Sequence, residues 1–180
     1  REAMKKYPFT YYDFKVYNTK RQFGNVVFSR YPLINKKTIR YESQTNISSQ
    51  CDIVVHSDTL RLMVNHLQSY GINKQDLQIG TLSMDGIKNS TLNQKLQIAD
   101  KLRHQQAKEV KHAIHKSPHP VIVVGDFNAI PLSRVYWRIK FGLRDTLLEG
   151  SLGRLGNTYK RNGVGVRIDY ILCSRSLNVI

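Results

Sequence analysis

The stretch that decides the fold is Val121-Ile122-Val123-Val124-Gly125-Asp126-Phe127-Asn128. Its continuous apolar, β-branched run predicts a strand that is buried on both faces of a sheet. Gly125 permits a tight exit from the strand, and two polar side chains follow at positions i and i+2. We therefore expect Asp126 and Asn128 to lie together at the rim of the sheet.

These two side chains suit chemistry on a phosphate. A carboxylate at Asp126 can hold a cation or orient a water molecule, and a carboxamide at Asn128 can donate a hydrogen bond to a phosphate oxygen without adding negative charge. The alternative interpretation is an Asx turn after a core strand. The octapeptide is thus a candidate site with a structural alternative.

Strand and helix patterns surround this segment and indicate an α/β layered domain. Apolar residues recur every three or four positions from about Leu92 to His115, which predicts a long helix that ends before Pro118. Ser133 is a suitable N-cap for a short helix through about Phe141. Further strands are expected at Gly24–Ser29, Lys36–Tyr41 and Val166–Cys173.

A β-hairpin is expected in the first half of the chain. Cys51–His56 and Thr59–His66 are rich in β-forming residues, and Ser57-Asp58 would connect them. Leu60, Leu62 and Val64 would share one face of the second strand. Three segments carry weaker patterns, because Tyr7–Tyr17 lacks a clear period while Gly71–Ser90 and Gly150–Gly165 resemble loops.

The composition indicates one folded domain with a basic surface. The chain has 180 residues, 41% of them hydrophobic, and a formal net charge of +15. Such a charge favours polyanions such as nucleic acid, anionic lipid or phosphorylated small molecules, although the basic residues are spread out and also fit a merely solvated surface. Cys51 and Cys173 are expected to be buried free thiols. No apolar run approaches the roughly 18 residues of a membrane span, so an anchor is expected only outside this chain.

Four segments in order resemble the endonuclease/exonuclease/phosphatase (DNase I-like) superfamily. Gly125–Asn128 resembles its G-D-x-N motif, and Gly24-Asn-Val-Val-Phe-Ser-Arg-Tyr-Pro32 its G-x-x-x-x-S-R-x-P segment. Asn65–Ser69 resembles its strand-ending H-L segment, and Arg167–Leu172 its R-x-D-x-x-L strand. The resemblance implies a four-layer α/β sandwich, in which two mostly antiparallel sheets face each other with helices outside. It also implies a hydrolase of phosphate esters that uses Mg²⁺ or Mn²⁺.

The resemblance assigns roles to four residues. Asp126 would orient or deprotonate the attacking water, and Asn128 would bind the scissile phosphate; both would also serve the metal. His66 would donate to a non-bridging phosphate oxygen, and Asp169 would orient a catalytic histidine. Alternatively, His66 is a structural histidine and Asp169 forms a local ion pair with Arg167.

Two parts of the family pattern have no match, namely the metal-binding Glu of a Q-E strand and the histidine of an S-D-H segment. We therefore expect residues 1–180 to be one domain that lacks its N-terminal strands and its C-terminal strand, and to be inactive alone. The substrate would be a phosphate ester, with nucleic acid and a phospholipid head group as candidates, and no obligate protein partner is evident. The rival interpretation is an inactive module on the same fold that binds polyanions or nucleic acid.

Overall fold

The structure, a computed structural model, describes residues 6–18, 21–41, 46–71, 91–151, 156–161 and 163–180. The strands are β1 (Phe9–Asn18), β2 (Arg21–Ser29), β3 (Leu33–Arg40), β4 (Ile47–Val55), β5 (Asp58–His66), β6 (Val121–Asp126), β7 (Leu143–Asp145), β8 (Tyr159–Arg161), β9 (Val164–Val166) and β10 (Asp169–Ser174). The helices are α3 (Thr91–His115), α4 (Arg134–Lys140) and α5 (Thr146–Gly150).

A six-stranded sheet in the order β3-β4-β5-β6-β10-β7 forms the centre of the fold. β5 and β6 are parallel, because α3 carries the chain from the end of β5 back to the start of β6. The other neighbouring strands are antiparallel. The ends of β5 and β6 and the start of β10 therefore meet at one edge of the sheet.

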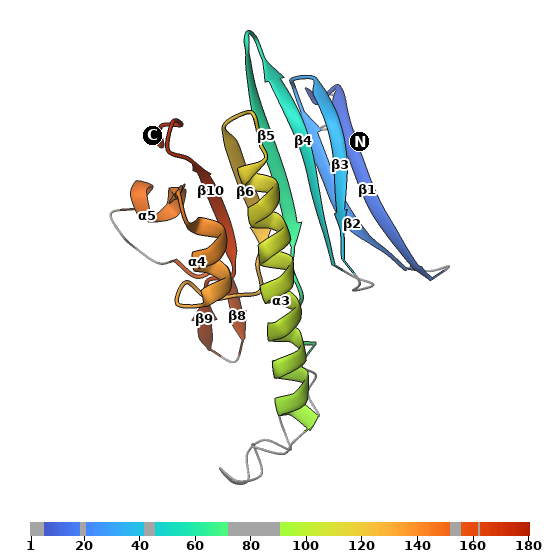
Figure 1. The fold of residues 1–180 in the computed structure, drawn as a ribbon, viewed down its shortest axis with the longest axis vertical. Coiled ribbons are helices and arrows are strands. Elements are labelled where there is room, and N and C mark those ends of the chain that lie inside the picture. The colour runs from blue at the N-terminus through green and yellow to red at the C-terminus, as the bar shows by residue number, and fades with distance from the viewer. Residues whose placement is uncertain (1–5, 19–20, 42–45, 72–90, 152–155, 162) are drawn as a thin grey trace.

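The sheet separates a helical layer from a two-stranded sheet made of β1 and β2 (Figure 1). On one face, Val110 of α3 and Ile139 of α4 pack against Met63. On the other face, Val27 of β2 packs with Leu62 and Val64 of β5. This arrangement confirms the expected α/β sandwich of helices and facing sheets.

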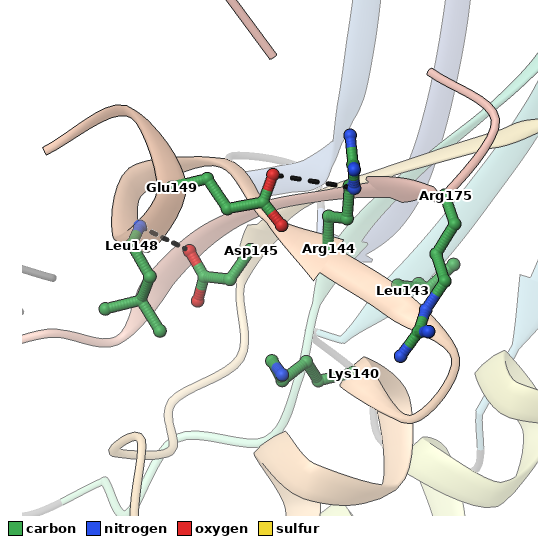
Figure 2. A pocket seen from close by; sticks show the side chains of 7 residues that line it. All are labelled: Lys140, Leu143, Arg144, Asp145, Leu148, Glu149 and Arg175. Atoms are coloured by element: carbon green, nitrogen blue, oxygen red, sulfur yellow. Dashed lines mark hydrogen bonds and ion pairs between the residues drawn. The ribbon is translucent and has the colours of Figure 1, made fainter. Parts of the chain in front are cut away.

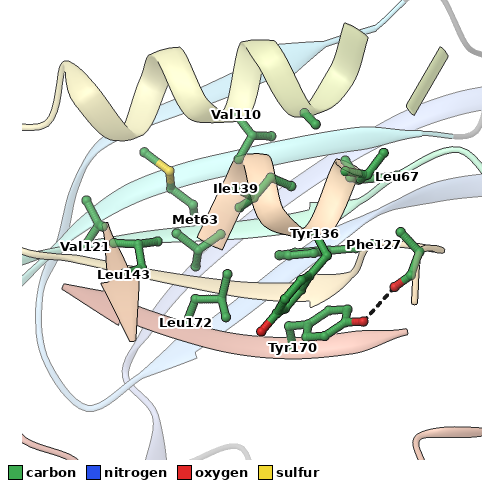
Figure 3. Packing of buried hydrophobic residues seen from close by; sticks show 14 residues of the cluster. Met63, Leu67, Val110, Val121, Phe127, Tyr136, Ile139, Leu143, Tyr170 and Leu172 are labelled. Atoms are coloured by element: carbon green, nitrogen blue, oxygen red, sulfur yellow. Dashed lines mark hydrogen bonds between the residues drawn. The ribbon is translucent and has the colours of Figure 1, made fainter. Parts of the chain in front are cut away.

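The core between the helices and the sheet is packed around aromatic rings (Figure 3). The ring of Tyr170 lies 4.9 Å from that of Phe127 and 4.8 Å from that of Tyr136, measured between centroids. Tyr136 comes from α4, whose N-terminus is capped by Ser133 as the sequence predicted. These contacts attach the loop after β6 to both α4 and β10.

Helix α3 confirms the predicted long helix, but its buried stripe is partly polar. Ala99, Ala107 and Val110 are buried against the sheet, as are Arg103 and Gln106. No helix in the described part of the chain is long and apolar enough to cross a membrane.

The central strand β6 is less buried than its sequence predicted. Val121 and Val123 are fully buried under the helices, while Ile122 and Val124 on the other face are only half-buried. The reason is that the β1–β2 hairpin contacts β3 and β4 rather than β6.

Several boundaries also differ from the sequence predictions. Residues 9–18 form β1 and pair with β2, although their sequence lacks a clear period. The alternation is hidden because the outward face carries exposed aromatic side chains, Tyr12 and Phe14. The hairpin turn is made by His56 and Ser57, one residue earlier than predicted, since Val55 pairs with Asp58. The segment Gly150–Gly165 contains β8 and the start of β9, and β10 begins only at Asp169. Gly71 is the only described residue of the predicted loop Gly71–Ser90, so that prediction lies almost wholly outside the described residues.

Candidate functional site

Three of the predicted site residues form one row across three neighbouring strands. His66 ends β5 and pairs in register with Asp126, which ends β6. Asp169 begins β10 and pairs with Asp126 from the other side. The Asp126 carboxylate therefore stands between an imidazole and a second carboxylate.

The row lies at the edge of the sheet where β5 and β6 end and β10 begins. At this edge Asp126 lines a pocket together with Asp100 and Arg103 of α3, so its side chain is accessible beside the end of the helical layer.

Gly125 makes the close approach of β5 and β6 possible. Its φ is +127°, in a region that other residues rarely adopt. A Cβ atom at this position would overlap the backbone carbonyl of Asn65. The glycine is thus required where the strand delivers Asp126 to the edge of the sheet.

Asp126 and Asn128 form the Asx turn that was the alternative interpretation of this segment. The Asn128 backbone N–H donates to Asp126 Oδ1 at 2.7 Å, and Asn128 adopts a φ of 48°. The Asn128 side chain donates from Nδ2 to the Leu67 carbonyl at 2.9 Å. Asp126 Oδ2 has no hydrogen-bond partner among the described residues, so the turn leaves one carboxylate oxygen free for chemistry.

Two buried polar residues of α3 hold the segment that follows His66. Gln106 Oε1 accepts from the Gln68 backbone N–H at 2.8 Å, and Arg103 donates to the Gln68 carbonyl at 3.0 Å. Neither residue was predicted from the sequence. The available signal was their spacing, because Arg103 and Gln106 continue the buried row of Ala99 where an apolar residue is expected.

Tyr170 is a further site-supporting residue that the sequence did not single out. Its buried hydroxyl donates to the Ala129 carbonyl at 2.7 Å and lies 3.0 Å from the Arg167 carbonyl. The first bond ties the residue after Asn128 to the strand that begins at Asp169. The positions of these two site residues therefore depend on one another.

Burial raises the pKa of the Asp126 carboxyl above its ordinary value. The Asn128 N–H opposes this rise, the charge of Asp169 adds to it, and His66 and Arg103 oppose it more weakly. The alternative of a local ion pair between Arg167 and Asp169 is wrong in this structure. Arg167 instead donates to Asp145 at 2.6 Å, and both side chains are buried.

An open pocket of about 570 Å³ lies beside this row. Asp126 and Asn128 line it, whereas His66 and Asp169 do not. Its other walls combine aromatic, aliphatic and polar side chains. They include Tyr70, Arg103, Ile130, Tyr159, Val166 and Ile168.

The oxygen atoms of Asp126 and Asn128 are suitable ligands for a hard cation such as Mg²⁺, but they are few. No group of three or more His, Cys, Asp or Glu residues in the described ranges is arranged to hold a metal ion. Asp126 and Asn128 supply oxygen atoms, which are the ligands that Mg²⁺ prefers, and Mg²⁺ commonly binds one or two carboxylates and completes its shell with water and substrate. The free Oδ2 of Asp126 and its position beside a second carboxylate fit such a cation.

Solved structures share this fold. The human Nocturnin catalytic domain matches with a TM-score of 0.62 at 16% identity, over 97% of this chain and 63% of that one. Humanised D. rerio TDP2 matches with a TM-score of 0.60 at 16% identity, over 93% of this chain and 63% of that one. The beta toxin of Staphylococcus aureus matches with a TM-score of 0.59 at 13% identity, over 96% and 65%. The chain thus spans somewhat less than two thirds of the length of these structures.

Sequence comparison gives the assignment. None of the curated protein sequences matches the chain significantly. The sequence profile of the Endonuclease/Exonuclease/phosphatase family, however, matches residues 1–180, which is the whole chain. The protein is therefore a member of the endonuclease/exonuclease/phosphatase family.

Proposed function

We propose that the protein hydrolyses phosphate esters by attack of water on phosphorus, with Asp126 as the group that activates the water. The observation that carries this proposal is the row of His66, Asp126 and Asp169 beside an open pocket. Burial raises the pKa of the Asp126 carboxyl toward neutral pH, and a general base takes up a proton more readily when its pKa is higher.

The roles of the residues follow from their contacts. Asp126 Oδ1 is fixed by the Asn128 N–H, which leaves Oδ2 to accept the proton of the water. The second N–H of the Asn128 amide and a ring N–H of His66 are available to donate to non-bridging phosphate oxygens. Asp169 would orient a catalytic histidine, and its charge disfavours a negative charge on Asp126.

A divalent cation belongs to this proposal. Asp126 and Asn128 would hold Mg²⁺ or Mn²⁺ through their side-chain oxygens. When bound, the ion would supply positive charge against the negative charge that develops on the phosphate. The side chains of the protein would still orient the water and the phosphate.

The substrate class is a phosphate ester whose organic part fits a partly aromatic pocket. Tyr70 and Tyr159, with Ile130 beside them, give the pocket apolar walls next to Asp126. Such walls suit a nucleoside or the glycerol end of a phospholipid head group. The similar Nocturnin catalytic domain was solved with a bound sulfate, an anion with the shape and charge of phosphate.

The test is hydrolysis of bis(4-nitrophenyl) phosphate by the full natural polypeptide in the presence of Mg²⁺. Asp126→Asn should lower kcat by at least about 100-fold, the usual contribution of a positioned general base. Asp58→Asn is the matched control, because this carboxylate lies exposed at the other end of β5. Equal activity of the Asp126→Asn variant and the wild type would contradict the proposal.

The second candidate is a non-catalytic module that binds polyanions, favoured by the net charge of +15. It requires no hydrolysis under any metal condition, together with binding of an oligonucleotide that weakens as salt is raised. For the 180 residues alone, the expectation of inactivity stands as a prediction of the same assay.

A further inference from the structure

A surface outside the site combines exposed apolar side chains with several basic ones. It is built on α4, the loop before it and the pocket after it. We call it the α4 patch, and it consists of Leu132, Arg134, Trp137, Arg138, Lys140, Phe141, Arg144 and Arg175.

The apolar members lie on the outer side of α4. Val135 and Ile139 are buried in the core, while Trp137 is 54% exposed and Phe141 at the C-cap is 75% exposed. Because Trp137 and Phe141 are four residues apart, they lie on the same side of the helix. Leu132, immediately before the N-cap, is 86% exposed. An apolar row of this exposure is unusual where it has no partner.

Basic groups surround this row. The sequence from Phe127 to Arg144 contains no Asp or Glu. Lys140 lies 5.0 Å from the centre of the Trp137 ring, and Lys111 of α3 lies 5.4 Å from that of Phe141. The row is therefore framed by cations that extend over aromatic rings.

The patch continues into a cationic pocket of about 420 Å³ (Figure 2). Lys140, Arg144 and Arg175 reach this pocket from three different segments. Two carboxylates also line it, but each has a basic partner, since Glu149 pairs with Arg144 at 3.5 Å and Asp145 with Arg167 at 2.6 Å. Neither Lys140 nor Arg175 forms an ion pair with any described carboxylate. The pocket can thus accept an anion of the size of a phosphate group.

We infer that the α4 patch docks the protein on an anionic phospholipid surface, with the apolar row inserted among the lipids and the cationic pocket on a phosphate head group. Peripheral membrane segments combine these same features, namely apolar and aromatic side chains beside Lys and Arg. Charge complementarity favours a lipid surface carrying negative charge. A nucleic acid would use the cations and the rings but would gain little from the aliphatic, almost fully exposed Leu132.

The inference goes beyond the proposed function and does not depend on it, because docking requires no hydrolysis. It has a consequence for the site nonetheless. Ile130 lies two residues before Leu132 and lines the pocket of Asp126. A docked molecule would carry the loop between the site and the patch to the membrane surface.

The chain contains its own probe, since Trp137 is the single tryptophan of the sequence. Adding vesicles of equimolar phosphatidylserine and phosphatidylcholine should shift its fluorescence to shorter wavelength, and brominated lipids should quench it. Vesicles of phosphatidylcholine alone should have a much smaller effect. An unchanged spectrum with the anionic vesicles would overturn the inference.

Variants separate the two parts of the patch. In vesicle sedimentation, Leu132→Ser with Phe141→Ala, and separately Lys140→Gln with Arg175→Gln, should each lower the partition coefficient at least about tenfold. Tyr12→Ala with Val16→Ala is the matched control, because these side chains are 57% and 67% exposed on β1. An equal loss in the control would overturn the inference.

An oligonucleotide supplies the last comparison. If single-stranded DNA quenches Trp137 more strongly than anionic vesicles do, and Leu132→Ser leaves that quenching unchanged, the patch is a nucleic-acid surface and the lipid inference is wrong. If hydrolysis by the full polypeptide fails while vesicle binding persists, only the proposed function is lost.

Discussion

Asp145 offers the sharpest test of how the scaffold under the site is held. Its carboxylate is 2% exposed and accepts from the Arg167 guanidinium at 2.6 Å and from the Tyr136 hydroxyl at 2.7 Å. It also caps α5 by accepting from the backbone N–H groups of Leu147 and Leu148. Burial raises the pKa of the Tyr136 hydroxyl, and the hydrogen bond to Asp145 and the charge of Asp145 raise it further. Asp145→Ala removes all of these contacts at once.

The size of the effect follows from the partner that is left behind. Arg167 is buried, and its Nε and second terminal nitrogen already have no hydrogen-bond partner among the described residues. Breaking a buried ion pair by deleting one partner costs about 3–5 kcal/mol, because the other charge stays in a region of low polarity. Loss of the N-cap alone would cost about 1 kcal/mol. We therefore expect Asp145→Ala to lower the free energy of unfolding by about 4 kcal/mol, a large part of a typical domain's stability.

Urea denaturation followed by circular dichroism measures this change. The control is Glu149→Ala, whose carboxylate pairs with Arg144 at 3.5 Å while both side chains are partly exposed, and it should cost less than about 1 kcal/mol. The double variant Asp145→Leu/Arg167→Met should be more stable than Asp145→Ala, because no charge is left unpaired. A cost of Asp145→Ala as small as that of the control would refute the reasoning.

Three further predictions concern Asp126, Gly125 and the Cys51 thiol. In metal-free buffer, the carboxyl carbon of Asp126 followed by NMR should titrate above the ordinary range of aspartate, and Asp169→Asn should lower that pKa. The folded protein holds this proton more tightly than the unfolded chain, so ionisation costs stability as pH rises through the raised pKa. Asp126→Asn should accordingly increase the unfolding free energy at pH 7; an unchanged or lower value would contradict this sign. Gly125→Ala should cost about 3 kcal/mol or more in thermal denaturation, because the new Cβ meets the Asn65 backbone, whereas Gly142→Ala, at a positive φ with open space around it, should cost about 1 kcal/mol. Burial raises the pKa of the Cys51 thiol to about 11, so a thiol reagent at pH 8 should label it only as fast as the protein opens; rapid labelling of the native protein would count against a closed core.

Much of the fold was predictable because its strongest elements follow regular patterns. The run Val121–Val124 is a strand, the apolar spacing from about Leu92 gives α3, and Ser133 caps α4. Local patterns fail where exposed aromatic residues blur the alternation, as in β1. They also fail at the end of a strand, where register rather than composition decides the turn, as at His56 and Ser57.

The site was predictable in part. The continuous apolar run and the glycine at its end predicted that Asp126 and Asn128 lie at the rim of the sheet, while the inclusion of His66 and Asp169 depended on the family resemblance. Their supports could not be found in this way, because Arg103 and Gln106 are polar residues in a buried row. The pairing of Arg167 with Asp145 joins positions 22 residues apart, and no local pattern encodes such a contact.

The arrangement of these supports explains how an unfavourable group of charges can persist in the fold. Asp126 is half-buried beside Asp169, and both this burial and the charge of Asp169 oppose the ionisation of Asp126. The backbone around these carboxylates is held by close packing and hydrogen bonds. Gly125 packs against the backbone of β5, and Gln106 and Arg103 bind the chain after His66. Tyr170 binds the Ala129 carbonyl and so connects the loop after β6 to β10. Strain of this kind is kept only where the surrounding structure over-determines it, and it is characteristic of functional sites. A cation held by Asp126, as in the proposed function, would offset this repulsion by placing positive charge beside the carboxylate.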